Sequence, residues 1–136
     1  MNEAVLDASV VLKWFRSDGE RHVEAARALR ASFEAGALVV LAPPLLHLEI
    51  VNVAGRRWHW PEASLVDLAD ALEDLGFDLR EPELTRVAKW TANGLTAYDA
   101  AYVALAEGEG IALITDDDPV VAAAAGIAIG LECAAG

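Results

Sequence analysis

Short runs of apolar residues alternate along the chain with longer stretches in which apolar residues recur every three or four positions. The short runs predict buried strands at residues 4–6, 38–41, 77–79, 111–114 and 127–129. The longer stretches predict helices at residues 20–35, 45–58, 63–75, 83–90, 96–107 and 119–125. This alternation is typical of an α/β fold, so we expect a mainly parallel sheet of about four or five strands flanked by helices.

The chain is expected to form one domain over residues 1–136. Its 136 residues are close to the usual size of a single domain, 55% of them are hydrophobic, and no repeat or linker interrupts the pattern. Uncharged stretches such as residues 119–131 are too short to span a bilayer, so no membrane association is expected. Cys133 is the only cysteine, which excludes an internal disulfide and favours a cytoplasmic location.

The net charge of −12 is distributed unevenly along the sequence. Residues 1–60 contain seven acidic and seven basic side chains, whereas residues 61–136 contain 15 acidic and three basic ones. Taken alone, the total argues against a polyanionic partner such as nucleic acid. The crowding of carboxylates in the second part therefore requires a separate explanation.

Acidic residues follow two of the predicted strands. Asp7 comes directly after the strand at 4–6, and an Asp triplet, residues 116–118, follows the strand at 111–114. Ligands of parallel α/β sheets bind outside the carboxyl ends of the strands, where these side chains are expected. A helix or turn cap explains Asp7 equally well, with Ser9 as the alternative cap. We expect Asp118 to cap a helix before Pro119, which leaves Asp117 free to face the crevice.

Two further acids lie within predicted helices. Glu49 lies among mostly apolar neighbours, so its carboxylate is expected to need a bound cation or a hydrogen-bond partner. A role without function is the alternative, in which Glu49 extends into solvent or pairs with Arg56 or Arg57. Asp99 has the spacing from Thr96 of a capping box, which by itself is a structural role.

Considered together, these acids indicate a metal site. Carboxylates that are brought together repel one another unless a cation neutralises them. A set of oxygen ligands selects Mg²⁺ or Mn²⁺, with Ca²⁺ as a further candidate, and the lack of a Cys pair or a closely spaced His pair argues against zinc. Mg²⁺ held by a few carboxylates commonly serves chemistry on phosphates.

Four blocks of the sequence resemble those of PIN-domain proteins, above all the VapC toxins of bacterial and archaeal toxin–antitoxin pairs. The blocks are LDASVVLKW (6–14), LEIVN (48–52), LTAYDAAYVALA (95–106) and LITDD (113–117). The resemblance covers essentially the whole chain, and it implies a three-layer PIN-like fold and Mg²⁺- or Mn²⁺-dependent endoribonuclease activity.

The resemblance also assigns roles to individual residues. It implies that the catalytic, metal-binding acids are Asp7, Glu49, Asp99 and Asp117. The hydroxyls of Ser9 and Thr115 fall where family members often order the site, and Asp116 is placed with them as a supporting residue. The Asp triplet departs from the family pattern, in which the final acid follows Thr by two residues. The implied partners are RNA, a second copy of the chain in a homodimer, and a VapB-like antitoxin.

Basic residues near the acids in sequence are candidate RNA contacts, namely Lys13, Arg16, Arg56 and Arg57. Trp58 and Trp60 are expected to pack rather than to stack on bases. Two other functions remain open at this point: a PIN-like RNA- or partner-binding module without catalysis, and a Mg²⁺-dependent small-molecule phosphohydrolase. A haloacid-dehalogenase type is disfavoured because Ser9 stands where that type needs a second Asp.

Overall fold

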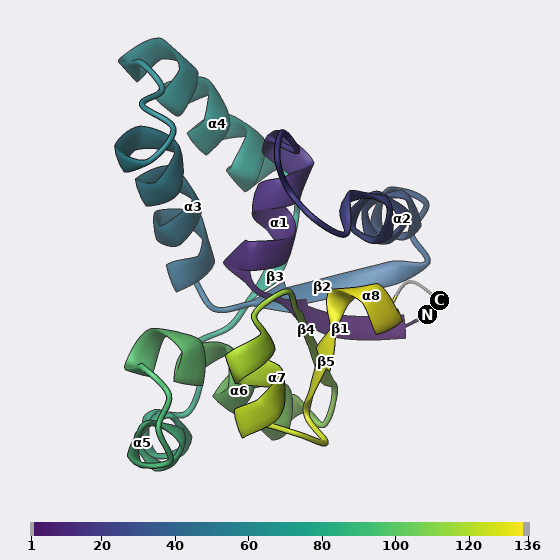
Figure 1. Ribbon diagram of the computed structural model, residues 1–136, viewed down its shortest axis with the longest axis vertical. Helices are drawn as coiled ribbons and strands as arrows, with labels where there is room; N and C mark the ends of the chain where they lie inside the picture. The colour runs from purple at the N-terminus through teal and green to yellow at the C-terminus, as the bar shows by residue number, and fades with distance from the viewer. Residues whose placement is uncertain (1, 135–136) are drawn as a thin grey trace.

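The computed structural model describes residues 2–134, which form a three-layer α/β fold (Figure 1). Its strands are β1 (Asn2–Leu6), β2 (Leu38–Ala42), β3 (Asp78–Leu79), β4 (Ala112–Thr115) and β5 (Ala128–Gly130). Its helices are α1 (Ala8–Phe15), α2 (Val23–Glu34), α3 (Leu45–Arg56), α4 (Glu62–Asp74), α5 (Leu84–Ala92), α6 (Ala97–Glu109), α7 (Asp118–Ala123) and α8 (Leu131–Ala134).

The five strands form one parallel sheet in the order β3-β2-β1-β4-β5. This confirms the α/β class and the mainly parallel sheet that the alternating pattern predicted. Figure 1 shows α1 and α2 above the sheet and α5 and α6 below it, while α3 and α4 extend beyond the sheet at the upper left. The chain places β2 and β3 on one side of β1, and β4 and β5 on the other, so the topological switch point lies between β1 and β4.

The core forms where the apolar strands meet the apolar faces of the helices. Central strand residues such as Val5 and Leu113 are completely buried, as are Val10 of α1 and Val103 of α6. Helix α6 is the most deeply buried helix, because every residue from Ala100 to Ala106 is buried, and four of these seven are alanines that allow close packing on the sheet. It ends at Gly110, whose φ of 69° is a left-handed conformation that glycine adopts without a steric penalty.

Two short helices were not among the predicted elements. Helix α1 begins at Ala8, and its N-cap Asp7 is the single residue between it and β1, so no turn separates the apolar pattern of the strand from that of the helix. Helix α8 has only four residues, too few to show a helical repeat. The predicted cap of α7 is also corrected: Asp117, not Asp118, is the N-cap residue, and its side chain accepts a hydrogen bond of 3.4 Å from the Val120 amide.

Candidate metal centre at the switch point

The register of the sheet places the two strand-end acids side by side. Leu6 pairs with Ile114 at the carboxyl ends of β1 and β4, and the Asp7 amide donates to the Ile114 carbonyl at 3.4 Å. The side chains that follow both strands therefore emerge at the same edge of the sheet. This edge is also the switch point, where open parallel sheets bind their ligands.

Asp7 is the most tightly held of the candidate ligands. Its carboxylate is only 7% exposed and accepts hydrogen bonds on both oxygens. Oδ1 accepts from the Ser9 hydroxyl at 2.5 Å and from the Ser9 amide at 3.1 Å, while Oδ2 accepts from the Thr115 hydroxyl at 2.5 Å. Asp7 is the N-cap of α1, as one of the two explanations from the sequence expected, and this capping role leaves it at the edge of the sheet where the candidate site lies.

The two hydroxyl groups that hold Asp7 are themselves held by the loop after β4. The Asp116 amide donates to Ser9 Oγ at 2.9 Å, and the Asp117 amide donates to Thr115 Oγ1 at 3.1 Å. Since each hydroxyl accepts from the backbone, its own proton is directed at Asp7. Ser9 and Thr115 therefore restrain the orientation of the Asp7 carboxylate.

Burial raises the pKa of Asp7 to about 6, and the nearby charge of Asp99 acts in the same direction. The hydrogen bonds from Ser9 and Thr115 oppose this increase because they stabilise the ionised form. The carboxylate is consequently ionised at neutral pH in spite of its burial. A buried carboxylate of this kind is stabilised further by a bound cation.

Glu49 reaches the same region from α3. Its Oε1 accepts a hydrogen bond from the Tyr102 hydroxyl on α6, so neither Arg56 nor Arg57 is its partner in the structure. Burial and the charge of Asp99 raise the pKa of Glu49, whereas the hydrogen bond from Tyr102 lowers it.

Asp99 lies in the first turn of α6, and its amide donates to the Thr96 hydroxyl at 3.1 Å. The capping interaction expected from Thr96 is therefore present, with the side chain of Asp99 half-buried beside the site. Burial raises the pKa of Asp99, and so does the negative charge of Asp117. Each of the four predicted acids thus interacts electrostatically with at least one of the others.

This donor set fits a hard divalent cation. All four candidates are carboxylates, and the charges of neighbouring acids raise the pKa of Asp7, Glu49 and Asp99, so a cation between them relieves their repulsion. No three of the four acids have ligand atoms that all lie within 4.8 Å of one another. Mg²⁺ needs no tighter cage, because it retains several waters and binds proteins through one or two carboxylates.

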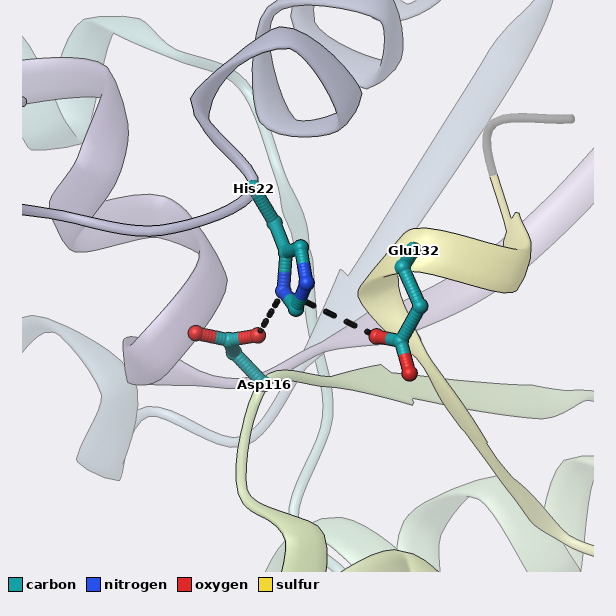
Figure 2. Close-up of side chains that lie close together, drawn as sticks. All are labelled: His22, Asp116 and Glu132. Atoms are coloured by element: carbon teal, nitrogen blue, oxygen red, sulfur yellow. Dashed lines mark hydrogen bonds and ion pairs between the residues drawn. The ribbon is translucent and has the colours of Figure 1, made fainter.

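Asp116, by contrast, belongs to an ion-pair cluster beside the site (Figure 2). Its carboxylate lies 2.8 Å from His22 Nδ1, 3.0 Å from the Lys13 ammonium and 3.3 Å from Arg21 Nε. Glu132 of α8 approaches the same His22 nitrogen at 3.7 Å. Burial alone would raise the pKa of Asp116, but hydrogen bonds with His22 and Lys13 hold it below its usual value. Asp116 supports the site through its amide, while its charge is neutralised by this cluster.

Sequence reasoning missed three residues around the site: His22, Glu132 and Tyr102. No local pattern marks His22 or Glu132, which are brought to Asp116 by the fold. Tyr102 did have a signal, because it lies three positions after Asp99 and thus on the same face of one helix.

The four basic residues predicted to contact RNA differ in their surroundings. The Lys13 side chain is only 2% exposed and pairs with Glu20 and Asp116. Arg16, Arg56 and Arg57 are exposed and form no ion pair within residues 2–134. Arg57 lines a cavity of about 400 Å³ that also contacts Ser9 and Asp116, whereas none of the four candidate metal-binding acids lines it.

Trp58 and Trp60 are half-buried and pack on each other, with ring centroids 5.3 Å apart, as expected. The Arg16 guanidinium covers the Trp58 ring at 5.3 Å from its centroid. On this surface the two tryptophans therefore provide packing, whereas Arg16 provides positive charge.

The four candidate acids thus come from the ends of β1 and β4 and from α3 and α6, around the switch point at which open parallel sheets bind their ligands. The PIN domain family profile matches residues 4–125, and the chain belongs to this family. PIN domains are in general metal-dependent nucleases.

The crystal structure of PAE2754 from Pyrobaculum aerophilum has the same fold. It superposes with a TM-score of 0.70 and 24% sequence identity, covering 98% of this chain and 93% of that one. No curated protein matches the sequence significantly. Within residues 2–134, no helix has the length and apolar character needed to cross a membrane.

Proposed function

We propose that this protein is an endoribonuclease that hydrolyses RNA phosphodiesters with Mg²⁺ or Mn²⁺. The observation that carries the proposal is the Asp7 carboxylate, buried at the switch point and held on both oxygens by Ser9 and Thr115. Orienting a buried charge in this way is costly for stability and is the arrangement expected of a preorganised metal ligand.

In this proposal Asp7, Glu49, Asp99 and Asp117 hold the ion. When bound, the ion polarises a phosphoryl oxygen and activates a water as the nucleophile. Ser9 and Thr115 hold Asp7 in one orientation, which reduces the reorganisation needed when substrate binds. The pKa of Asp7, near 6, keeps this carboxylate ionised and available as a ligand at neutral pH.

The RNA backbone would be bound by the arginine surface, which we define as Arg16, Arg56 and Arg57. These side chains carry unpaired positive charge on a protein whose net charge is −12. A local basic surface beside an acidic site is consistent with a substrate whose phosphates must approach a metal ion. Since the Lys13 ammonium is buried in ion pairs, the proposal assigns the direct phosphate contacts to the arginines.

We further propose that the protein is the toxin of a VapBC-type pair, acting in the cytoplasm as a homodimer with a VapB-like antitoxin. Large apolar side chains that are exposed on the surface support an interaction with partner chains; they include Leu48, Val66 and Leu84. A basic side chain of the antitoxin that entered the acidic site would inhibit it by charge complementarity.

The test is cleavage of total RNA by the purified protein, with cleavage sites mapped by sequencing. We expect activity with Mg²⁺ or Mn²⁺, loss of activity in EDTA and recovery after Mn²⁺ is restored. Asp99→Asn should abolish cleavage while leaving the fold intact, and Asp67→Asn, which changes an exposed acid of α4, is the matched control. Full activity of Asp99→Asn would contradict the proposed mechanism.

The same preparations separate the two alternative functions. A small-molecule phosphohydrolase would hydrolyse p-nitrophenyl phosphate and leave RNA intact. A binding module without catalysis would retain RNA with unchanged length in the presence of either metal.

A further inference from the structure

Glu49 differs from the other three acids in how it is supported. Asp7 and Asp117 are helix N-cap residues, and Asp99 lies in a capped first turn, so local backbone geometry restrains each of them. Glu49 lies in the second turn of α3, has a longer and more flexible side chain, and has no capping role. Something outside its own helix must restrain this carboxylate.

Helix α3, which carries Glu49, lies away from the central sheet, so the position of the Glu49 carboxylate is not fixed by the sheet itself. Helix α3 packs mainly against α1 and α4, and together with α4 it extends beyond the sheet (Figure 1). The other three acids follow β1, follow β4 or begin α6, which are elements packed directly on the central sheet. The distance of Glu49 from the remaining acids therefore depends on a contact between α3 and the body of the domain.

Tyr102 supplies such a contact. Its side chain is 2% exposed on the most buried helix of the fold, and its hydroxyl donates to Glu49 Oε1. Within residues 2–134 this is the hydrogen bond that Glu49 makes, and the carboxylate has no ion-pair partner there. The second oxygen, Oε2, is left without a protein donor and remains available as a ligand.

The direction of this hydrogen bond follows from the atoms that form it. The Tyr102 hydroxyl carries the proton, and Glu49 Oε1 accepts it. When Glu49 is ionised, the charged acceptor makes this bond stronger than one between neutral groups.

We propose that Tyr102 is a positioning residue that orients Glu49 for the divalent ion by means of this hydrogen bond. The inference rests on the proposed metal-dependent function and adds a residue that acts through Glu49 rather than on the substrate. A structural role in the core alone would require the ring of Tyr102 but not its hydroxyl.

The experiment compares Tyr102→Phe with Tyr98→Phe. Both variants lose one hydroxyl from the same helix, but Tyr98 is 63% exposed and its hydroxyl has no partner among the described residues. The affinity for Mn²⁺ is measured by electron paramagnetic resonance titration of the protein without RNA, and folding is monitored by thermal denaturation in EDTA. Loss of a hydrogen bond to a metal ligand should weaken Mn²⁺ binding roughly 10- to 100-fold in Tyr102→Phe. Tyr98→Phe should bind Mn²⁺ like the wild type.

Cleavage kinetics provide a second measurement. The Mn²⁺ concentration for half-maximal cleavage should increase in Tyr102→Phe, whereas kcat at saturating Mn²⁺ should change little. A variant that only disturbs the core would lower the melting temperature, but it would not selectively raise the Mn²⁺ concentration needed for half-maximal cleavage while leaving kcat unchanged.

A double-mutant cycle tests whether Tyr102 acts through Glu49. Glu49→Gln retains an acceptor for Tyr102 but removes the charged ligand. If Tyr102 acts through Glu49, adding Tyr102→Phe to Glu49→Gln should cause no further loss of Mn²⁺ affinity. Independent, additive losses would overturn the inference.

The outcomes separate this inference from the proposed function. If wild-type protein cleaves RNA and Tyr102→Phe binds Mn²⁺ with wild-type affinity, the positioning role is overturned and the nuclease function stands. If the wild type binds Mn²⁺ tightly, Tyr102→Phe binds it weakly and neither cleaves RNA, the positioning role stands and the nuclease function fails. If the wild type binds no Mn²⁺, both are overturned.

Discussion

Thr115 and Asp7 are 108 positions apart in the sequence, and a 2.5 Å hydrogen bond from the Thr115 hydroxyl to Asp7 Oδ2 joins them. The bond connects the carboxyl ends of β4 and β1 at the switch point of the sheet. It both completes the support of a buried carboxylate and fixes its orientation towards the other acids.

Thr115→Val tests the contribution of this bond. The substitution keeps the shape of the side chain but leaves Oδ2 of a buried carboxylate without its donor, which should cost about 1–3 kcal/mol of stability. The pKa of Asp7 should rise further above its value of about 6, because a hydrogen bond to the ionised form is lost. The acidic limb of the pH–activity profile should therefore move to higher pH. Thr85→Val, in which an exposed hydroxyl loses its bond to Glu83, is the control and should leave this limb unchanged.

The pKa of Asp7 also predicts how the stability of the metal-free protein depends on pH. The folded protein holds the proton up to about pH 6, whereas the unfolded chain releases it near 3.8, so the folded state binds more protons between these values. Stability must therefore fall as the pH rises from about 4 to about 6, and the two pKa values correspond to a loss of about 3 kcal/mol.

Asp7→Asn provides the reference for this measurement, since Asn cannot ionise. In EDTA, the difference in unfolding free energy between wild type and Asp7→Asn should change by this amount between pH 4 and pH 7, in favour of the variant at the higher pH. At neutral pH, Mn²⁺ should stabilise the wild type more than the variant. A difference that stays constant with pH would show that Asp7 does not titrate in this range.

The three members of the Asp triplet are predicted to behave differently. Asp116→Asn removes one of the two ion-pair partners of the buried Lys13 ammonium, which keeps Glu20, and should lower the free energy of unfolding by about 1–3 kcal/mol. Asp117→Asn should leave stability nearly unchanged, because Asn caps helices as well as Asp, but it should weaken Mn²⁺ binding and cleavage. Asp118 is exposed and pairs with Arg21 at the surface, so Asp118→Asn should change stability by less than about 1 kcal/mol.

Denaturant unfolding and Mn²⁺ titration of the three variants check this assignment. The resemblance to the PIN-domain family, in which the final acid follows Thr by two residues, favoured Asp117, and the proposed site retains that choice. Wild-type metal affinity in Asp117→Asn, together with weak affinity in Asp118→Asn, would transfer the ligand role to Asp118.

The arginine surface predicts a change in the salt dependence of RNA binding. Arg56→Ala combined with Arg57→Ala should weaken binding of single-stranded RNA and reduce the slope of log K against log salt by roughly 1.4, or 0.7 for each phosphate contact. Fluorescence anisotropy of a labelled oligonucleotide with the inactive Asp99→Asn protein measures this slope. The control combines Arg27→Ala with Lys89→Ala, which removes the same charge from α2 and α5 and should leave the slope unchanged. Equal slopes in both double variants would exclude the arginine surface from the RNA path.

Local sequence patterns were sufficient for most of the fold. The apolar runs marked the strands, and the spacing of apolar residues in stretches such as 63–75 marked helices that the structure places within a few residues of the expected bounds. The pattern failed at Ala8–Phe15, where a helix begins directly after a strand, and at the cap of α7, where two neighbouring aspartates compete for one position. Both failures concern elements whose boundaries depend on side-chain contacts rather than on periodicity.

The sequence by itself determined the α/β class and the chemical character of the four acids, because periodicity and residue type are local properties. Only the tertiary structure decided the strand order, which places Asp7 beside the end of β4 and makes Thr115 its partner. It also decided that Lys13 is buried with Asp116 and that Tyr102 holds Glu49, since these contacts join segments 53 or more positions apart. The burial and pairing of charges depend on contacts between distant segments of the folded chain, so short-range sequence patterns cannot predict them.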